Sequence, residues 1–317
     1  MPEVSVLIPA FRPQYLDLAI ASILAQTYTD FELIVSDDSN GDDVERVVSK
    51  WSDARLRYVR NNRRQLPGAN RDYLISLARG RYLKFVFDDD FLLPRSLEVL
   101  YTAAMSVDGD LVFHGRYLVD DQGRPLGKAS VLEDGQVAKV DPPVLFVSML
   151  GGIQNFIGEP SNILISADML RAIPNPFGIG GERLRFLTDV ALYVNIAASG
   201  GTIVGAGAIG SAFRFHASQT SAVGGSAYSA GLFEWEYIVR WAADRGFLDS
   251  GSAISAISTC RSNYLPFLEA YPELRVLATV STPTRPDESF LAAQYMTALR
   301  SAWDTVDQRN SRSRAVA

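Results

Sequence analysis

Cysteine and long apolar runs are scarce in this sequence of 317 residues. The single cysteine, Cys260, excludes an internal disulfide and a metal cluster built from several cysteines, and it fits a reducing compartment. No apolar run approaches the roughly 20 residues that cross a bilayer, and the N-terminus enters a predicted strand without a signal peptide. We therefore expect a cytoplasmic protein with no transmembrane segment.

An excess of basic charge is also missing. The chain has 30 Lys and Arg residues against 36 Asp and Glu residues, a net charge of −6, so we expect no nucleic-acid partner. Glycine is absent from the loop Pro9-Ala10-Phe11-Arg12 that follows the first predicted strand. The missing glycine-rich phosphate loop weakens two alternatives, a nucleotidyltransferase and a nicotinamide-dependent dehydrogenase.

The most informative stretch that is present covers residues 82–94. A short apolar run predicts a buried strand, and it ends at Asp88-Asp89-Asp90, followed by a turn and Pro94. Three adjacent carboxylates repel one another, so a divalent cation that also carries substrate phosphates would suit them. The alternative is a solvated acidic turn in which one Asp caps the next helix. The local sequence alone favours neither interpretation.

Strand and helix patterns alternate through the first part of the chain. Residues 4–11, 31–35 and 56–59 are predicted strands, residues 15–26 and 43–51 are predicted helices, and a further helix begins at Gly68. This order predicts βαβ units and a parallel sheet. The strand at 31–35 also ends in carboxylates, Asp37-Asp38, and parallel strands open onto the same sheet edge, so both acidic ends can face one site.

The later part of the chain predicts shorter strands and then helices. Strands are expected at 109–114, 158–165 and 200–204, and residues 212–221 are expected as a strand running into a loop. A turn-rich excursion or hairpin is expected at 119–143 and a flexible, lid-like loop at 174–181. Helical patterns follow at 232–245, 252–268 and 287–305. We expect a sheet domain over residues 1–222 and a C-terminal helical region over residues 223–317.

Two side chains in this part have open roles. Asp189 lies in the first turn of a helix that begins at Thr188, where a carboxylate is either a capping or dipole-pairing residue or a general base. His216 follows a predicted strand, and it is either a structural histidine or a ligand that completes a carboxylate metal site.

Taken together, the first strand with Pro9-Ala10-Phe11, the second ending Asp37-Asp38-Ser39 and the aspartates before Pro94 resemble family 2 of the inverting glycosyltransferases. The resemblance runs from Val4 to about Ser221. It implies an α/β fold of the GT-A type, a doubly wound, mostly parallel sheet flanked by helices, here with a C-terminal helical appendage.

The resemblance also implies roles for individual residues. Asp189 matches the family's catalytic carboxylate, and Asp89, with His216 in a similar position to a histidine of some members, would hold Mg²⁺ or Mn²⁺. Phe87 and Thr188 depart from the acidic residues that relatives often carry, which leaves the donor sugar and the acceptor geometry open. The implied nucleotide-sugar-binding residues are Pro9, Ala10, Phe11, Asp38 for the base, Arg71 for the base or phosphates, and Asp88 for the ribose.

The activity implied by the resemblance is transfer of a sugar from a nucleotide diphosphate sugar to an acceptor hydroxyl. A UDP- or dTDP-sugar is favoured as donor, and the acceptor would be a polysaccharide, a lipid-linked glycan or a small-molecule natural product. A catalytically degenerate sugar-nucleotide-binding subunit is the alternative. The C-terminal helices could hold a second copy of the chain or place it at the inner face of the membrane.

Overall fold

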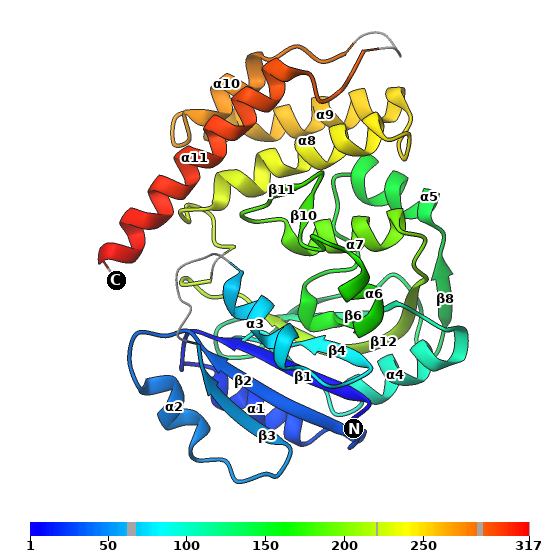
Figure 1. The fold of residues 1–317 in the computed structure, drawn as a ribbon, viewed down its shortest axis with the longest axis vertical. Helices are drawn as coiled ribbons and strands as arrows, with labels where there is room; N and C mark the ends of the chain where they lie inside the picture. Colours follow the sequence, from blue (N-terminus) through cyan, green and yellow to red (C-terminus); the bar gives the residue numbers. More distant parts are fainter. Residues whose placement is uncertain (62–67, 220, 284–287, 317) are drawn as a thin grey trace. The chain divides into compact units, whose positions relative to one another are not determined.

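The computed structural model describes residues 1–61, 68–219, 221–283 and 288–316 (Figure 1). The chain forms two compact units, each built from separate segments. Unit 1 comprises Met1–Val140, Phe156–Pro174 and Gly201–His216, and unit 2 comprises Asp141–Asn155, Asn175–Gly200 and the chain from Ala217 onward. Residues 141–155 and 175–200 thus group with the C-terminal helices. This division describes compact units and does not test which part of the chain has which role. The predicted catalytic domain over 1–222 and helical region over 223–317 therefore stay a prediction.

Unit 1 is organised around one mixed sheet that joins ten strands of the described residues. Its first half is parallel, because β1 pairs with both β2 and β4, and β2 pairs with β3. The path runs β3-β2-β1-β4-β9-β6-β12-β5, with β7 beside β6 and β8 beside β12. The strands are β1 (Val4–Ala10), β2 (Phe31–Asp37), β3 (Leu56–Arg60), β4 (Tyr82–Phe85), β5 (Phe91–Leu92), β6 (Leu111–Val119), β7 (Pro125–Ala129), β8 (Val137–Val140), β9 (Ile163–Ser166) and β12 (Ile203–Arg214).

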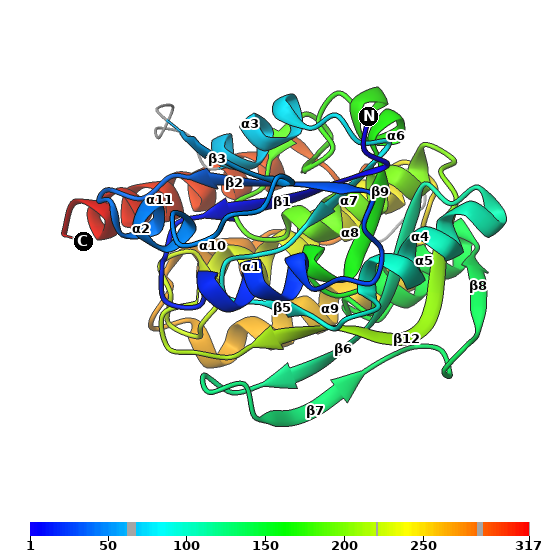
Figure 2. The ribbon, with the colours of Figure 1, turned by 90° about the horizontal axis from the view of Figure 1, so that it is seen from below.

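Helices cover both faces of the parallel half of this sheet, as Figure 2 shows, with α1 on one side and α3 on the other. Strand β1 explains this arrangement, since Val6 and Ile8 join the cluster that buries α1, while Leu7 between them points to the opposite face and is equally buried. The unit 1 helices are α1 (Leu16–Leu24), α2 (Asp43–Val48), α3 (Ala69–Leu77), α4 (Ser96–Val107), α6 (Ala167–Ala172) and a 3₁₀ turn at Pro160–Asn162.

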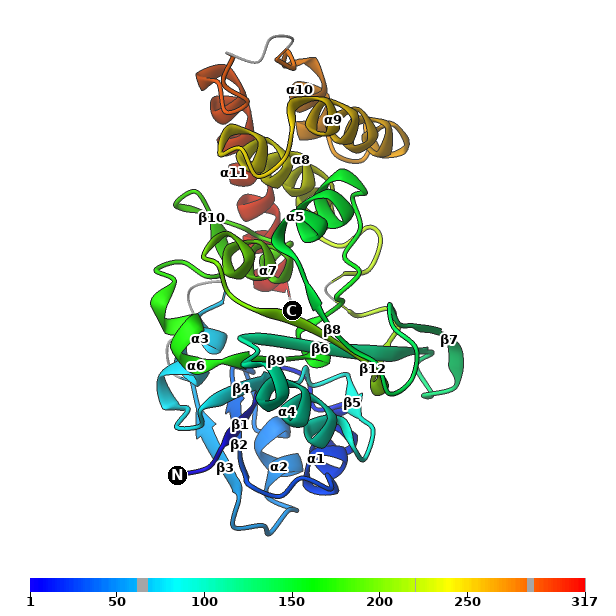
Figure 3. The ribbon, with the colours of Figure 1, turned by 90° about the vertical axis from the view of Figure 1, so that its right-hand side faces the viewer.

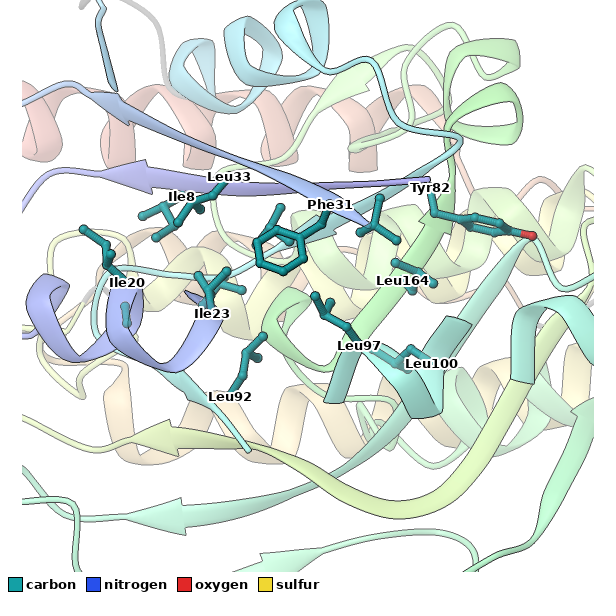
Figure 4. Close-up of a cluster of buried hydrophobic side chains, with 14 of the residues drawn as sticks. Ile8, Ile20, Ile23, Phe31, Leu33, Tyr82, Leu92, Leu97, Leu100 and Leu164 are labelled. Carbon is teal, nitrogen blue, oxygen red and sulfur yellow. The ribbon is translucent and has the colours of Figure 1, made fainter. Parts of the chain in front are cut away.

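The core on the α1 side is continuous from α1 to α4 (Figure 4). Helix α1 contributes residues at the spacing of one helix face, including Ile20 and Ile23, to the same buried cluster as Phe31 of β2. Leu97 and Leu100 of α4 extend the same core. The alternation of strands and helices predicted from the sequence up to β4 is therefore confirmed.

Three local predictions for unit 1 need correction. The strand expected at 200–204 and the strand expected to begin at 212 are one strand, β12, which stays continuous through register shifts between Ala206 and Ile209 and between Ile209 and Ser211. Phe91–Leu92, expected as a turn, pairs with β12 as the short strand β5. The excursion at 119–143 does contain a hairpin, β6 with β7, but its second half pairs with β12 as β8.

Unit 2 is mainly helical (Figure 3), and α8 packs against α9 and α11. Its centre is aromatic, because Trp303 of α11 meets Tyr237 of α8 edge to face with ring centroids 5.3 Å apart. The predicted helix start at Asp287 lies outside the described residues. The elements are α5 (Pro142–Leu145), a π-helical turn at Phe146–Gly151, β10 (Gly178–Ile179), β11 (Glu182–Arg183), α7 (Thr188–Ala198), α8 (Tyr228–Asp244), α9 (Ser250–Tyr264), a 3₁₀ turn at Leu265–Phe267, α10 (Glu273–Thr279) and α11 (Ala293–Val316).

The segment expected as a flexible lid is a hairpin, β10 with β11, that other parts of unit 2 hold. Asn195 donates to the carbonyl oxygens of Asn175, Pro176 and Gly178, and the Tyr237 hydroxyl donates to the carbonyl oxygen of Ile179 at 2.7 Å. These anchors argue against a free lid. Within the described part of the chain, no helix has the length and apolar character to cross a membrane.

Candidate functional site

The carboxyl ends of β1, β2 and β4 meet at one edge of the sheet in unit 1. Ala10, the last residue of β1, lies opposite Asp37 at the end of β2, and the N–H of Asp38 donates to the Ala10 carbonyl oxygen at 2.9 Å. On the other side of β1, Leu7 lies opposite Phe85. The two acidic strand ends predicted to share an edge therefore do so, with Pro9 and Ala10 between them.

Asp88 ties the end of β4 to the loop after β1. Its Oδ2 accepts hydrogen bonds from the backbone N–H groups of Phe11 at 2.7 Å and Arg12 at 2.8 Å. Burial raises the pKa of this carboxyl to about 6, although the two N–H groups act in the opposite direction. Asp88 thus shapes the Pro9-Ala10-Phe11 loop. Its implied contact with a ribose stays a prediction.

Asp89 faces His216, with its Oδ2 2.9 Å from the ring Nε2. The imidazole lies against the ring of Tyr15, the two centroids being 5.2 Å apart. The Arg214 guanidinium stacks over the same Tyr15 ring at 4.3 Å and donates through Nε to the backbone oxygen of Asp89 at 2.9 Å. The residues predicted as a metal pair are therefore brought together by β12 and the end of β4, and the Asp89 side chain keeps 22% of its surface exposed.

Asp90 points into the protein. It accepts hydrogen bonds from the Ser161 hydroxyl at 2.6 Å and the Arg214 N–H at 3.2 Å, while the buried ammonium-bearing side chain of Lys84 donates to the Ser161 carbonyl oxygen. Burial raises the pKa of Asp90 well above its usual range and lowers that of Lys84 to about 7. The three consecutive carboxylates therefore have separate environments.

The alternative of a helix-capping acidic turn is wrong. Helix α4 begins at Ser96, and its N-cap residue, Arg95, receives no side-chain capping hydrogen bond. Instead the amide oxygen of Gln26 accepts the N–H of Leu97 in the first turn, at 3.0 Å.

The other acidic end divides its two carboxylates in a similar way. Asp37 is fully buried and accepts hydrogen bonds from the Tyr58 hydroxyl, the Arg60 guanidinium and the Ser39 N–H. Asp38, the residue implied to bind the base, is partly exposed. Arg71 lies in the first turn of α3, which Asn70 fastens to this edge by donating to the Ser36 carbonyl oxygen at 2.9 Å.

Asp189 belongs to unit 2. It is the second residue of α7, and its Oδ2 accepts a hydrogen bond from the Asn155 side-chain amide at 2.8 Å. The N-cap position of α7 is occupied by Leu187, so Asp189 is not the capping residue. An amide donor at one oxygen orients the carboxylate, and a carboxylate is one of the groups that can act as a general base.

The donor set of Asp89 and His216 fits a divalent cation in part. No group of three or more His, Cys, Asp or Glu side chains able to hold a metal occurs among the residues that the structure describes. A carboxylate and an imidazole are suitable ligands for Mn²⁺ or Mg²⁺, and such ions commonly bind through one or two protein groups together with substrate phosphates. The two residues therefore fit an ion that arrives with a diphosphate better than a closed protein cage.

Sequence reasoning missed four residues, three at this edge of unit 1 and one, Asn155, beside Asp189 in unit 2. Lys84 carried a usable signal, because a lone cation inside an apolar strand needs a buried partner. Arg214, two residues before His216, carried a weaker one. Ser161 and Asn155 had no distinguishing sequence pattern, since their importance comes from contacts with residues far away in the chain.

The sequence of this chain matches the model of a known protein family. The model for "Glycosyl transferase family 2" matches residues 5–168, slightly more than half of the chain. The match ends before Asp189 and His216, so their roles stay predictions.

Curated relatives are similar over somewhat less than half of the chain. A Campylobacter jejuni GalNAc(5)-diNAcBac-PP-undecaprenol beta-1,3-glucosyltransferase is 34% identical over 148 residues, which cover 44% of this chain and 47% of the relative. The Staphylococcus aureus poly(ribitol-phosphate) beta-N-acetylglucosaminyltransferase TarP is 35% identical over 147 residues, 44% of each chain. The aligned region thus spans less than half the length of these relatives.

Solved structures agree with the fold over nearly the whole chain. S. aureus TarS 1-349 in complex with UDP-GlcNAc superposes with a TM-score of 0.60 at 16% identity, covering 96% of this chain and 81% of that chain. At this identity the likeness establishes the fold, and it confirms the predicted GT-A-type sheet flanked by helices. Because the family match over residues 5–168 coincides with the parallel sheet and its acidic strand ends, the chain belongs to glycosyl transferase family 2.

Proposed function

We propose that this protein is an inverting glycosyltransferase that moves a sugar from a nucleotide diphosphate sugar, preferably a UDP-sugar, to an acceptor hydroxyl. The observation that carries the proposal is the sheet edge at which the Asp88 carboxylate binds the loop after β1 while Asp89 faces His216. Ligands of α/β sheets bind at the carboxyl ends of parallel strands, and this is such an end.

On the donor side, Asp38 would accept the ring N–H of a pyrimidine, and Arg71 would contact the base or the phosphates. Asp89 and His216 would hold Mg²⁺ or Mn²⁺. When bound, such an ion supplies a Lewis acid for the charge that develops on the diphosphate. Pro9, Ala10 and Phe11 would line the nucleotide, with the loop held by Asp88 in the conformation that the two N–H bonds define.

On the acceptor side, Asp189 would remove the proton from the attacking hydroxyl. The new bond forms between the acceptor oxygen and the anomeric carbon as the bond from that carbon to the diphosphate oxygen breaks. Attack opposite the leaving group inverts the anomeric centre. A positioned general base contributes roughly 10² to 10⁴ in rate, and the Asn155 amide keeps the Asp189 carboxylate oriented for this role.

The donor preference draws support from similar proteins. Solved TarS structures contain UDP-GlcNAc or UDP, and a curated Escherichia coli relative is named as a UDP-Glc-dependent transferase. For the acceptor, relatives are named for undecaprenol-linked and poly(ribitol-phosphate) substrates. We therefore propose a hydroxyl on a cell-envelope glycan or lipid-linked glycan, reached from the cytoplasmic side.

A thermal-shift series with UDP, dTDP, GDP, CDP and NAD, each with and without Mn²⁺, tests the donor side. A ligand of the folded state stabilises it by RT ln(1 + [L]/Kd), so about 100 times Kd adds roughly 2.7 kcal/mol. We expect metal-dependent stabilisation by UDP that Asp89→Ala removes. Response to none of the diphosphates would refute the donor site and favour the degenerate subunit.

Asp189→Asn tests the base independently. We expect a loss of about 10² or more in kcat with UDP-sugar binding unchanged. Near-normal transfer by this variant would contradict the role of Asp189 while leaving the donor site intact.

A further inference from the structure

The segment immediately before Asp189 is held by a buried carboxylate of α8, Glu234. Its Oε1 accepts the N–H of Arg185 at 2.6 Å and the Trp303 indole N–H at 3.0 Å. Its Oε2 accepts the N–H groups of Phe186 at 3.0 Å and Leu187 at 2.8 Å. Glu234 has no exposed surface, so its carboxylate depends on these protein donors and not on solvent for its hydrogen bonds.

All four partners are donors, which has a chemical consequence. Only the ionised carboxylate offers enough lone pairs to accept two hydrogen bonds at each oxygen without presenting a proton of its own. A buried carboxylate with three consecutive backbone N–H partners is an expensive feature that simple core packing does not require, because an apolar side chain could fill the same volume. What these bonds determine is the path of residues 185–187.

Three further contacts define the same path. The Arg185 guanidinium pairs with Asp307 of α11 at 2.7 Å and stacks over the Trp303 ring at 4.9 Å. Gly231, one turn before Glu234 on α8, lets the Phe186 ring approach so closely that an added Cβ would lie 2.8 Å from it. Helices α8 and α11 thus grip residues 185–187 through a carboxylate, an ion pair and a close ring contact.

We propose that Glu234 is a positioning residue for the transfer reaction: it fixes the chain that enters α7 and thereby sets the place of the Asp189 carboxylate. This inference rests on the proposed function of Asp189. Leu187 is bound by Glu234 and is also the N-cap of α7, and its carbonyl oxygen accepts the N–H of Ala191. Since Asp189 is two residues further on, a shift of the 185–187 path moves the carboxylate with the first turn of the helix.

Helix α8 provides a matched control. Glu236 is also fully buried, but it binds Arg240, Arg261 and the Tyr264 hydroxyl, partners that lie outside residues 183–189. Glu234→Gln replaces two acceptor positions by an N–H₂ group that faces N–H donors, and Glu236→Gln makes the same chemical change in the same helix. Both variants are expected to lower the melting temperature.

Steady-state kinetics and UDP binding separate positioning from stability. We expect Glu234→Gln to lower kcat about 10- to 100-fold, because a misplacement near 1 Å can cost 10²-fold, while the KM for the donor and UDP binding stay unchanged. Glu236→Gln should keep kcat near the unmodified value below its melting temperature. An equal kcat for the two variants would overturn the inference.

A double variant distinguishes this inference from the proposed base. If Glu234 acts through Asp189, Glu234→Gln should cause no further loss of residual rate in an Asp189→Asn background, since groups that act as a unit are non-additive. Full additivity would overturn the positioning role, whereas a fully active Asp189→Asn protein would overturn the base itself.

A surface variant keeps the test available if Glu234→Gln does not fold. Asp307 is 44% exposed, so Asp307→Asn should fold. It should lower kcat by roughly two- to fivefold, in line with the modest strength of exposed ion pairs. An unchanged kcat for Asp307→Asn, in the absence of folded Glu234→Gln, would count against the grip on residues 185–187.

Discussion

Replacing Lys84 by Met should change how the stability of the protein depends on pH. Lys84 is fully buried in β4, and burial lowers the pKa of its ammonium group to about 7, with the nearby Asp90 acting in the opposite direction. In the unfolded chain a lysine has a pKa near 10.4. Between these values the unfolded state binds more protons than the folded state, so the free energy of unfolding rises with pH in this window.

The size of the effect follows from the two pKa values. From pH 7 to pH 9 the lysine stays protonated in the unfolded chain, while in the folded protein it loses its remaining proton just above pH 7. A difference of one bound proton raises the unfolding free energy by about 1.36 kcal/mol per pH unit. The Lys84 contribution to the rise in unfolding free energy is therefore about 2 kcal/mol over two pH units. Met retains most of the side-chain volume and has no proton to bind.

Urea unfolding at pH 7, 8 and 9 measures this slope in both proteins. We expect the unfolding free energy of the unmodified protein to rise by about 2 kcal/mol more than that of Lys84→Met between pH 7 and pH 9. Only the difference in slope is compared, because Met also removes the hydrogen bond to the Ser161 carbonyl oxygen. Parallel slopes would refute the reasoning and would mean that Lys84 stays charged beside Asp90.

Other predictions test the division of roles between neighbouring residues. Asp37→Asn should lower the unfolding free energy by about 2–3 kcal/mol, because the fully buried side chain at this position would lose its charged hydrogen bonds to Tyr58 and Arg60. Asp38→Asn should leave urea stability nearly unchanged and weaken UDP binding in calorimetry. The reverse pattern would contradict the assignment. Gly231→Ala should lower the melting temperature despite its gain in helix propensity, because the new Cβ would lie 2.8 Å from the Phe186 ring; a higher melting temperature would show that the ring moves freely.

Local patterns determined the parallel half of unit 1 and its acidic edge. Apolar runs bounded by turns predicted β1, β2 and β4, and the helical spacing of Leu16, Ala19, Ile20 and Ile23 predicted α1 with its buried face. Strand and helix alternation then required parallel pairing, which brings Asp37-Asp38 and Asp88-Asp89 to one edge. Each strand and helix in this half was recognisable from neighbouring residues, and their order in the chain then fixed the parallel pairing, so the sequence alone was sufficient.

Only the tertiary structure decided what each carboxylate does. Asp88, Asp89 and Asp90 are chemically identical and adjacent, yet one binds the Phe11 loop, one faces His216 and one is buried against Ser161. Those partners lie between 71 and 127 residues away in the chain, so no local pattern encodes the choice. The same is true of Glu234, which lies in a segment that the sequence predicted only as a helix. Its partners at residues 185–187 exist only after α8 packs in unit 2, because hydrogen bonds select side chains by position in space and not by spacing in sequence.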